Sequence, residues 1–178
     1  RNRLIRLIGD PEKRYQEDPV RMLRAVRFAA KLDFDIEKHS AAPIPHLARL
    51  LHEIPSARLF DEVLKLFLAG NAEHTFELLL EYNLFAPLFP AAAAALKRDP
   101  EYAGELIRLA LASTDRRIEQ GKTVTPAFLF AALLWPALPT RVSELQGKGM
   151  PAIPAMQEAA LKAHKTVGAG GYSRSDFI

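Results

Sequence analysis

The sequence predicts an all-α fold with roughly seven to nine helices. Apolar residues recur at helical spacing in long segments, and proline or glycine separates these segments from one another. Sustained period-two alternation of β-branched residues is missing, except for a short stretch at residues 4–8. The chain has 178 residues, of which 49% are hydrophobic and 25% charged, so it can build a sizeable folded core. No fixed-period repeat is evident, which argues against a solenoid.

The first helices are predicted from the helix signals at their starts. Asp18 and Pro19 are typical of an N-cap and a first helical residue, and they introduce a helical pattern over residues 20–32. Residues 39–53 contain two prolines, so we expect one or two short helices there.

The next two helices are separated by a glycine. Ser56 can cap a helix that runs through residue 68 and ends at Gly70 and Asn71. Residues 73–82 repeat the pattern, and Asn83 follows at a position where a helix end is expected.

The remaining segments alternate between connectors and helices. Residues 84–89 form a short apolar connector, closed by prolines. Residues 126–135 are apolar nearly all round, which predicts a buried helix. Further helices are expected at residues 91–97, 101–114, 140–146 and 154–165.

Positive charge is concentrated at the start of the chain. The whole chain has a formal net charge of +3, but residues 1–31 alone hold nine basic and four acidic side chains. The other residues are therefore slightly acidic. A basic end on a near-neutral body suggests contact with phosphate or nucleic acid, and a solvated helix face is the alternative.

A helical wheel of residues 20–32 separates two faces. Met22, Val26, Ala29 and Ala30 lie on the face that seeks the core. The other face, called the basic face below, presents three guanidiniums, one ammonium and one ring: Arg21, Arg24, Arg27, Lys31 and Phe28.

Such a face suits a nucleotide. Guanidiniums grip phosphates or base acceptors with a fork of donors, and a carboxylate accepts from an exocyclic base amine. Asp18 and Arg21, about one helical turn apart, can therefore read a base edge together. The structural alternative is that Glu17 and Asp18 cap the helix and pair with Arg14 and Arg21.

The string from Arg6 to Ala30 closely resembles the neck of the class II template-independent nucleotidyltransferases, which are bacterial poly(A) polymerases and CCA-adding tRNA nucleotidyltransferases. Glu17, Asp18 and Arg21 match the Glu-Asp-x-x-Arg motif of that family. A second family element resembles residues 57–67, and the likeness extends over most of residues 4–165.

The resemblance implies roles for the matching residues. Asp18 and Arg21 would interact with the incoming base, and Arg24 and Arg27 would support the nucleotide. Supporting roles, in moving or steadying the site, fall to Asp10, Arg14, Glu17, Arg58 and Glu62.

The resemblance also implies an organisation and a branch of the family. Residues 1–70 would be a neck with the base-recognition helices, residues 71–165 a helical body on the RNA-binding side, and residues 166–178 a flexible or non-native tail. Residues 54–60, 81–90 and 126–135 look more like poly(A) polymerases than like CCA-adding enzymes.

Catalysis in this family needs an N-terminal head with a Gly-rich turn and two carboxylates that bind Mg²⁺, and neither feature occurs in the 178 residues. The resemblance therefore implies a part of a polynucleotide adenylyltransferase, which adds AMP from ATP to RNA 3′ ends. We expect this part alone to be inactive and to hold no Mg²⁺ of its own, because the ions would sit in the head. Two alternatives stay open: part of a CCA-adding enzyme, and a non-catalytic helical RNA-binding or interaction module.

Other chemistry finds little support. The chain has no cysteine, so thiolate metal sites and cysteine nucleophiles are excluded. Five histidines form no metal-binding motif, and Asp33 to Asp35 are expected to be a surface turn. No apolar run is long enough for a membrane span, and we expect a cytoplasmic protein. The oligomeric state is not predicted.

The aromatic residues at core spacings are expected to pack in the interior. They are Phe60, Phe67, Phe76, Phe85, Phe89, Phe128, Phe130 and Trp135.

Overall fold

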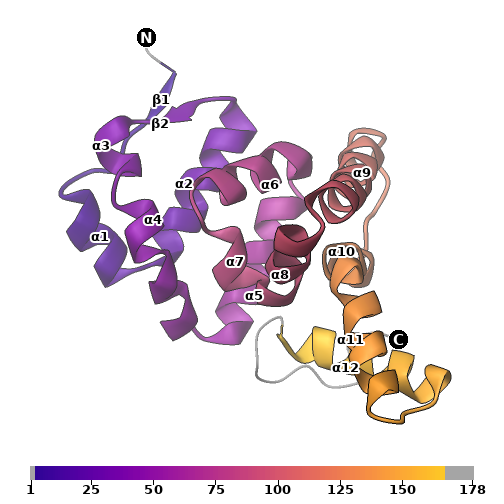
Figure 1. The fold of residues 1–178 in the computed structure, drawn as a ribbon. Coiled ribbons are helices and arrows are strands. Elements are labelled where there is room, and N and C mark those ends of the chain that lie inside the picture. Colours follow the sequence, from indigo (N-terminus) through magenta and orange to yellow (C-terminus); the bar gives the residue numbers. More distant parts are fainter. Residues whose placement is uncertain (1–2, 167–178) are drawn as a thin grey trace.

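The computed structural model describes the backbone of residues 3–166 and the side chains of residues 3–160. This part of the chain is a bundle of α-helices (Figure 1), which confirms the all-α prediction. Nine of its α-helices have seven or more residues, and three have four residues each. The α-helices are α1 Pro11–Glu17, α2 Val20–Leu32, α3 Lys38–Ala41, α4 Ile44–Leu47, α5 Ser56–Phe67, α6 Ala72–Glu81, α7 Phe85–Leu88, α8 Pro90–Arg98, α9 Pro100–Glu119, α10 Pro126–Leu134, α11 Leu138–Gly147 and α12 Ala152–Thr166.

Short elements complete this part of the chain. Two 3₁₀-helices, η1 Ala48–Glu53 and η2 Trp135–Ala137, follow α4 and α10. The expected short apolar connector at residues 84–89 contains the four-residue helix α7, which the sequence did not predict. None of the helices in the described residues is long and apolar enough to cross a membrane. The tail predicted at residues 166–178 lies outside the described residues, apart from the last residue of α12.

A pair of two-residue strands joins the start of the chain to the segment after α2. Strand β1, Leu4–Ile5, runs parallel to β2, Asp35–Ile36. The stretch at residues 4–8 is therefore extended in part, as the sequence suggested. The prediction for Asp33 to Asp35 was incomplete: Asp33 ends α2 in a left-handed conformation, but Asp35 belongs to β2.

Two predicted caps were wrong. Pro19, and not Asp18, occupies the cap position of α2, and Asp18 has extended backbone. The Asp18 carboxylate accepts a hydrogen bond from Arg58 instead of capping the helix. Ser56 is the first residue of α5, and Pro55 precedes it at the cap position without a side-chain cap. Both helices nevertheless begin within a residue or two of the predicted positions.

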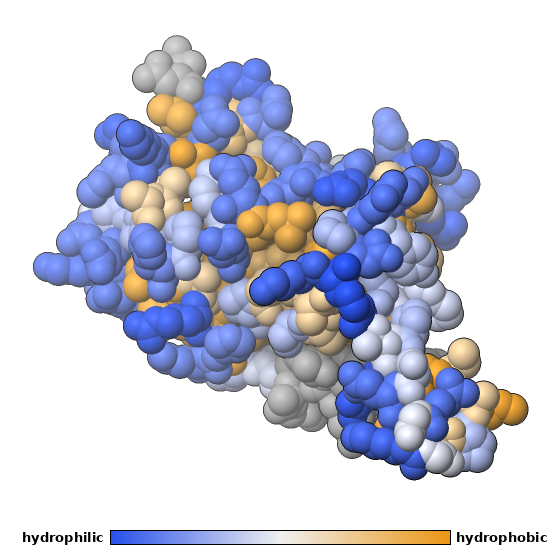
Figure 2. Space-filling view, viewed as in Figure 1, coloured by the Kyte–Doolittle hydropathy of each residue, from blue (hydrophilic) through white to orange (hydrophobic). Residues whose placement is uncertain are grey.

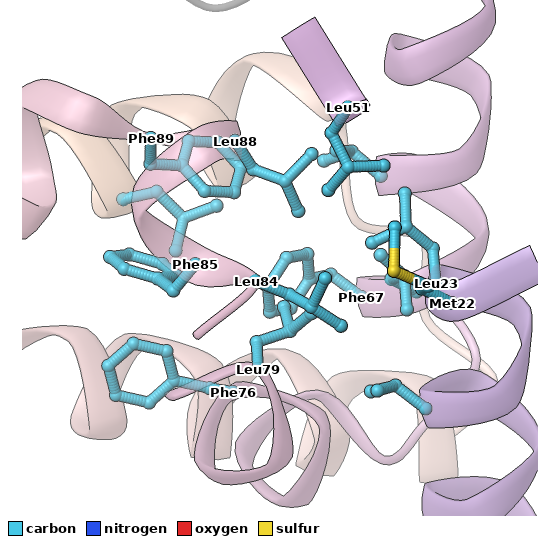
Figure 3. Packing of buried hydrophobic residues seen from close by; sticks show 14 of the residues in the cluster. Met22, Leu23, Leu51, Phe67, Phe76, Leu79, Leu84, Phe85, Leu88 and Phe89 are labelled. Carbon is cyan, nitrogen blue, oxygen red and sulfur yellow. The ribbon is translucent and has the colours of Figure 1, made fainter. Parts of the chain in front are cut away.

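Most of the core is one continuous hydrophobic cluster (Figure 3). Helix α2 contributes Met22 and Leu23 to it, and it packs against α5 and α6. Aromatic rings fill the space between α5, α6, α7 and α10. Within it, Phe76 lies edge-on to Phe85, with 5.0 Å between ring centroids, and Phe60 stacks on Phe130 at 5.0 Å. This cluster fixes α2 and α5 side by side, which is the arrangement that the candidate site needs.

Two of the expected core aromatics lie at the surface. Phe128 is 44% exposed and Trp135 is 51% exposed, so the prediction of core packing was wrong for both. Helix α10 is apolar nearly all round, but it buries one side only, through Leu129, Phe130 and Leu133. Helices α11 and α12 lie at the far end of the bundle (Figure 1) and enclose a small cluster of their own. Apolar residues also reach the surface in small areas between polar ones (Figure 2).

Candidate nucleotide-binding face

Helix α1 lies directly before Asp18, the first residue of the candidate site. Asp10 caps this helix, because its Oδ1 accepts hydrogen bonds from the backbone N–H of Glu12 at 3.0 Å and of Lys13 at 3.4 Å. In the last turn, Arg14 donates to Glu17 at 2.9 Å. The predicted supporting residues Asp10, Arg14 and Glu17 thus stabilise the helix that leads to Asp18.

Asp18 lies in the turn between α1 and α2, where a long-range ion pair fixes it. The Arg58 guanidinium, on α5, donates to Asp18 Oδ2 at 2.9 Å, and the Asp18 side chain is 19% exposed. The other carboxylate oxygen, Oδ1, is buried and has no hydrogen-bond partner among the described residues. The alternative pairing of Asp18 with Arg21 is not what the structure has, whereas the alternative pairing of Glu17 with Arg14 is present.

Arg21 follows Asp18 in the first turn of α2. Its side chain is half-buried, and its Nε is buried without a hydrogen-bond partner among the described residues. The Nε of Arg14 is likewise buried without a hydrogen-bond partner among the described residues. A buried polar atom without a partner carries a desolvation cost of about 1–3 kcal/mol. An acceptor on Asp18 and a donor on Arg21 are thus both unsatisfied in this arrangement, in which both atoms are closed to solvent.

Arg24 is tied to α5 through a buried carboxylate. Glu62 Oε1 accepts hydrogen bonds from Arg24 at 3.3 Å and from Lys65 at 3.1 Å, and the Glu62 side chain is 5% exposed. Burial alone would raise the pKa of Glu62, but the hydrogen bonds from Lys65 and Arg24 lower it below its usual value. Glu62 is therefore ionised at neutral pH and holds two cations together. The predicted supporting residues Arg58 and Glu62 thus each contact one predicted nucleotide-binding residue.

The rest of the basic face is open to solvent. The Arg27 guanidinium lies 4.9 Å from the centroid of the Phe28 ring, and Phe28 is 43% exposed. Lys31 is exposed at the end of α2. Met22 and Val26, on the opposite face, are fully buried. The separation of α2 into a basic face and a core face is therefore confirmed.

Sequence reasoning missed Lys65 as a member of this site. Its spacing of three residues from Glu62 on a helix was the available signal. In the described part of the chain, no group of three or more histidine, aspartate or glutamate side chains lies together that could hold a metal ion. We assign no metal to these residues.

Comparisons with known proteins show the family to which the chain belongs. Residues 33–96 match the family model described as "Probable RNA and SrmB- binding site of polymerase A". Poly(A) polymerase I of Salmonella typhimurium is 56% identical over 133 residues, which are 74% of this chain and 29% of that protein. Poly(A) polymerase I of Haemophilus influenzae is 52% identical over 146 residues, which are 82% of this chain and 32% of that protein.

A CCA-adding enzyme of Ligilactobacillus salivarius is less similar. It is 38% identical over 104 residues, which are 57% of this chain and 26% of that protein. The chain therefore belongs to the family of template-independent RNA nucleotidyltransferases formed by poly(A) polymerases and CCA-adding enzymes. Within that family, its similarity is greater to the poly(A) polymerase I proteins. It spans about a third of the length of the curated relatives it matches.

Proposed function

We propose that this chain is the neck and body of a bacterial poly(A) polymerase, and that the parent enzyme transfers AMP from ATP to RNA 3′ ends. Pyrophosphate is the second product of this transfer. Identities of 52% and 56% to proteins named Poly(A) polymerase I support the choice of branch. The chemistry is assigned to the parent, because this chain corresponds to about a third of those relatives.

Within the neck, residues 1–70, we assign base selection to Asp18 and Arg21. The exocyclic amine of adenine is a donor, and the adjacent ring nitrogen is an acceptor. A carboxylate and a guanidinium about one helical turn apart offer the complementary acceptor and donor. The observation that carries this assignment is that Asp18 and Arg21 lie about one helical turn apart at the start of α2 and do not pair with each other, because Asp18 pairs with Arg58.

Arg24 and Arg27 are assigned to the nucleotide phosphates. Guanidiniums bind phosphate oxygens through charge-assisted hydrogen bonds, and both side chains lie on the same face of α2 as Arg21. Arg24 also pairs with Glu62, which holds its guanidinium near α5. The expected partners of the parent are ATP and RNA 3′ ends, with the body, residues 71–165, on the RNA side.

Mg²⁺ is assigned to the head of the parent enzyme. Two ions held by carboxylates there would supply activation of the RNA 3′ hydroxyl and stabilisation of the leaving pyrophosphate. The residues of this chain bind and orient the nucleotide, and no metal is assigned to them. A cytoplasmic location is expected for the parent, because its proposed substrates are ATP and RNA.

The proposed function is tested by offering ATP and CTP separately and together to the full-length parent. The substrates are an unrelated RNA and a tRNA that lacks its 3′ end. We expect long adenylate tails on the unrelated RNA with ATP, and no ordered CCA addition to the tRNA. Gel electrophoresis of end-labelled RNA measures both products.

Each other outcome overturns the proposal in a different way. Ordered addition of two cytidylates and one adenylate to the tRNA would identify a CCA-adding enzyme. No incorporation of either nucleotide by the intact protein would favour a non-catalytic helical RNA-binding module. The 178-residue chain alone is expected to add no AMP in the presence of Mg²⁺, and measured incorporation by it would contradict the assignment of catalysis to the head.

A further inference from the structure

Ser40 carries a buried hydroxyl that the candidate nucleotide-binding face does not use. It lies in α3 and is 1% exposed. Its Oγ accepts a hydrogen bond from the backbone N–H of Leu7 at 3.0 Å and donates to Glu37 Oε2 at 3.1 Å. The hydroxyl is therefore engaged both as donor and as acceptor, and it joins two segments that are 33 residues apart.

The backbone of Ser40 joins a third element to the same point. Its N–H donates to Glu37 Oε2 at 3.0 Å, and its carbonyl accepts from the Tyr15 hydroxyl on α1 at 2.9 Å. Tyr15 is fully buried, and burial raises its pKa to about 12, so the phenol is a donor at neutral pH. Leu7, Tyr15, Glu37 and Ser40 form what is called the Ser40 network below.

Residues 3–9 also make other contacts. Arg3 donates to the carbonyl oxygen of Asp33 at 2.7 Å and to its carboxylate at 2.5 Å, and Ile5 and Leu7 pack against the main hydrophobic cluster. At the ends of the β1–β2 pair, the backbone N–H of Asp35 donates to Arg3 O at 3.1 Å and that of Glu37 to Ile5 O at 2.8 Å.

The Arg6 guanidinium lies 3.9 Å from Glu37 Oε1. Because the Arg6 side chain is 75% exposed, this ion pair contributes little to stability. The strand pair also packs against α2, and Ile36 belongs to the main hydrophobic cluster. The Leu7–Ser40 hydrogen bond adds a connection from this segment to α3, and the Tyr15–Ser40 bond connects α3 to α1.

We propose that Ser40 is a positioning residue, whose network fixes residues 3–9 and α1 relative to the basic face of α2. This inference rests on the proposed function, in which a catalytic head precedes residues 3–9. Ser40 does not contact the nucleotide in this role. It raises the fraction of molecules in which the head and the base-selecting residues are aligned.

The proposal has a specific kinetic consequence. When only a fraction of the molecules is competent to bind, the apparent dissociation constant rises by the inverse of that fraction. A loosened network therefore raises KM for ATP and leaves kcat nearly unchanged, because the aligned complex is the same once formed. A role limited to overall stability would change neither constant at temperatures where the enzyme is folded.

The test compares Ser40→Ala and Ser40→Thr in the full-length parent. We expect Ser40→Ala to raise KM for ATP about tenfold, which corresponds to one hydrogen bond of ordinary strength, with kcat within about twofold. Amide hydrogen exchange should show lost protection in residues 3–9. Ser40→Thr keeps the hydroxyl and should restore both the KM and the protection.

Thr114→Val is a matched control for the loss of a buried hydroxyl. Thr114 is also 1% exposed, and its Oγ1 donates to Ala110 O at 3.0 Å within α9, outside the Ser40 network. We expect this variant to leave KM and the exchange of residues 3–9 unchanged. An equal rise in KM in the two variants would overturn the proposal.

The exchange measurement separates this proposal from the proposed function, because it needs no activity. Unchanged exchange of residues 3–9 in Ser40→Ala would contradict the proposal even if the parent adds AMP. Lost protection together with a raised KM supports it. A parent that adds no AMP would contradict the proposed function, and with it the catalytic consequence of the Ser40 network.

Discussion

Replacing Arg21 with alanine in the full-length parent is expected to lower kcat/KM for ATP about 100-fold. A hydrogen bond to a charged group contributes about 1.5–3 kcal/mol, and each 1.4 kcal/mol is a factor of about ten. Arg21 lies within one turn of Asp18, its side chain is partly exposed, and it does not pair with that carboxylate, so its guanidinium is open to a ligand. Preference for ATP over CTP should fall together with the rate, because the base edge is no longer read.

A second variant at this position separates the effect of geometry from that of charge, and a variant of another arginine serves as the control. Arg21→Lys keeps the positive charge but removes the fork of donors, so we expect a loss close to that of the alanine variant. Arg49→Ala removes an exposed arginine from η1, outside the basic face, and should change kcat/KM by less than about twofold. Steady-state kinetics with ATP and CTP measure all three. Full activity and unchanged selectivity of Arg21→Ala would remove Arg21 from the site.

Phe89→Ala is expected to have the largest effect on stability. Phe89 is fully buried, and its ring lies 6.3 Å from Phe67, 5.2 Å from Phe85 and 6.5 Å from Phe130, between centroids. Removing such a ring leaves a cavity between helices that hold α5 in place. The free energy of unfolding should fall by about 3–5 kcal/mol.

Phe128→Ala is the matched control for that change. It makes the same substitution on the exposed side of α10, where the ring is 44% exposed, and it should cost less than about 1 kcal/mol. Urea unfolding followed by circular dichroism gives both values. Similar midpoints for the two variants would mean that the aromatic cluster does not stabilise the fold as described.

Local signals predicted the helix that carries the site well. The expected bounds of α2 agree with the structure, in which Pro19 takes the cap position before Val20 and Asp33 ends the helix in a left-handed conformation. The assignment of its two faces follows from a period of about 3.6 residues, and a regular helix must obey it. These features depend on neighbouring residues, so the sequence contains them directly.

Contacts between distant segments were not predictable in the same way. Arg58 and Asp18 are 40 residues apart, and only the packing of α2 against α5 brings them together. The cap of α2 was misassigned for this reason, since the Asp18 carboxylate is taken by a partner that no local pattern indicates. The role of Ser40 likewise has no local signal, because its partner Leu7 is 33 residues away in the chain. The prediction that Phe128 is buried was wrong, because the hydrophobicity of a helix does not tell which of its sides faces the bundle.

The central claim is that Asp18 and Arg21 read the base of the incoming nucleotide. A crystal structure of the full-length parent with a non-hydrolysable ATP analogue tests this claim most directly. The account predicts the Asp18 carboxylate within about 3 Å of the exocyclic amine of adenine, and the Arg21 guanidinium within the same distance of a ring nitrogen. Adenine bound with both side chains more than about 3.5 Å from its polar edge would contradict it.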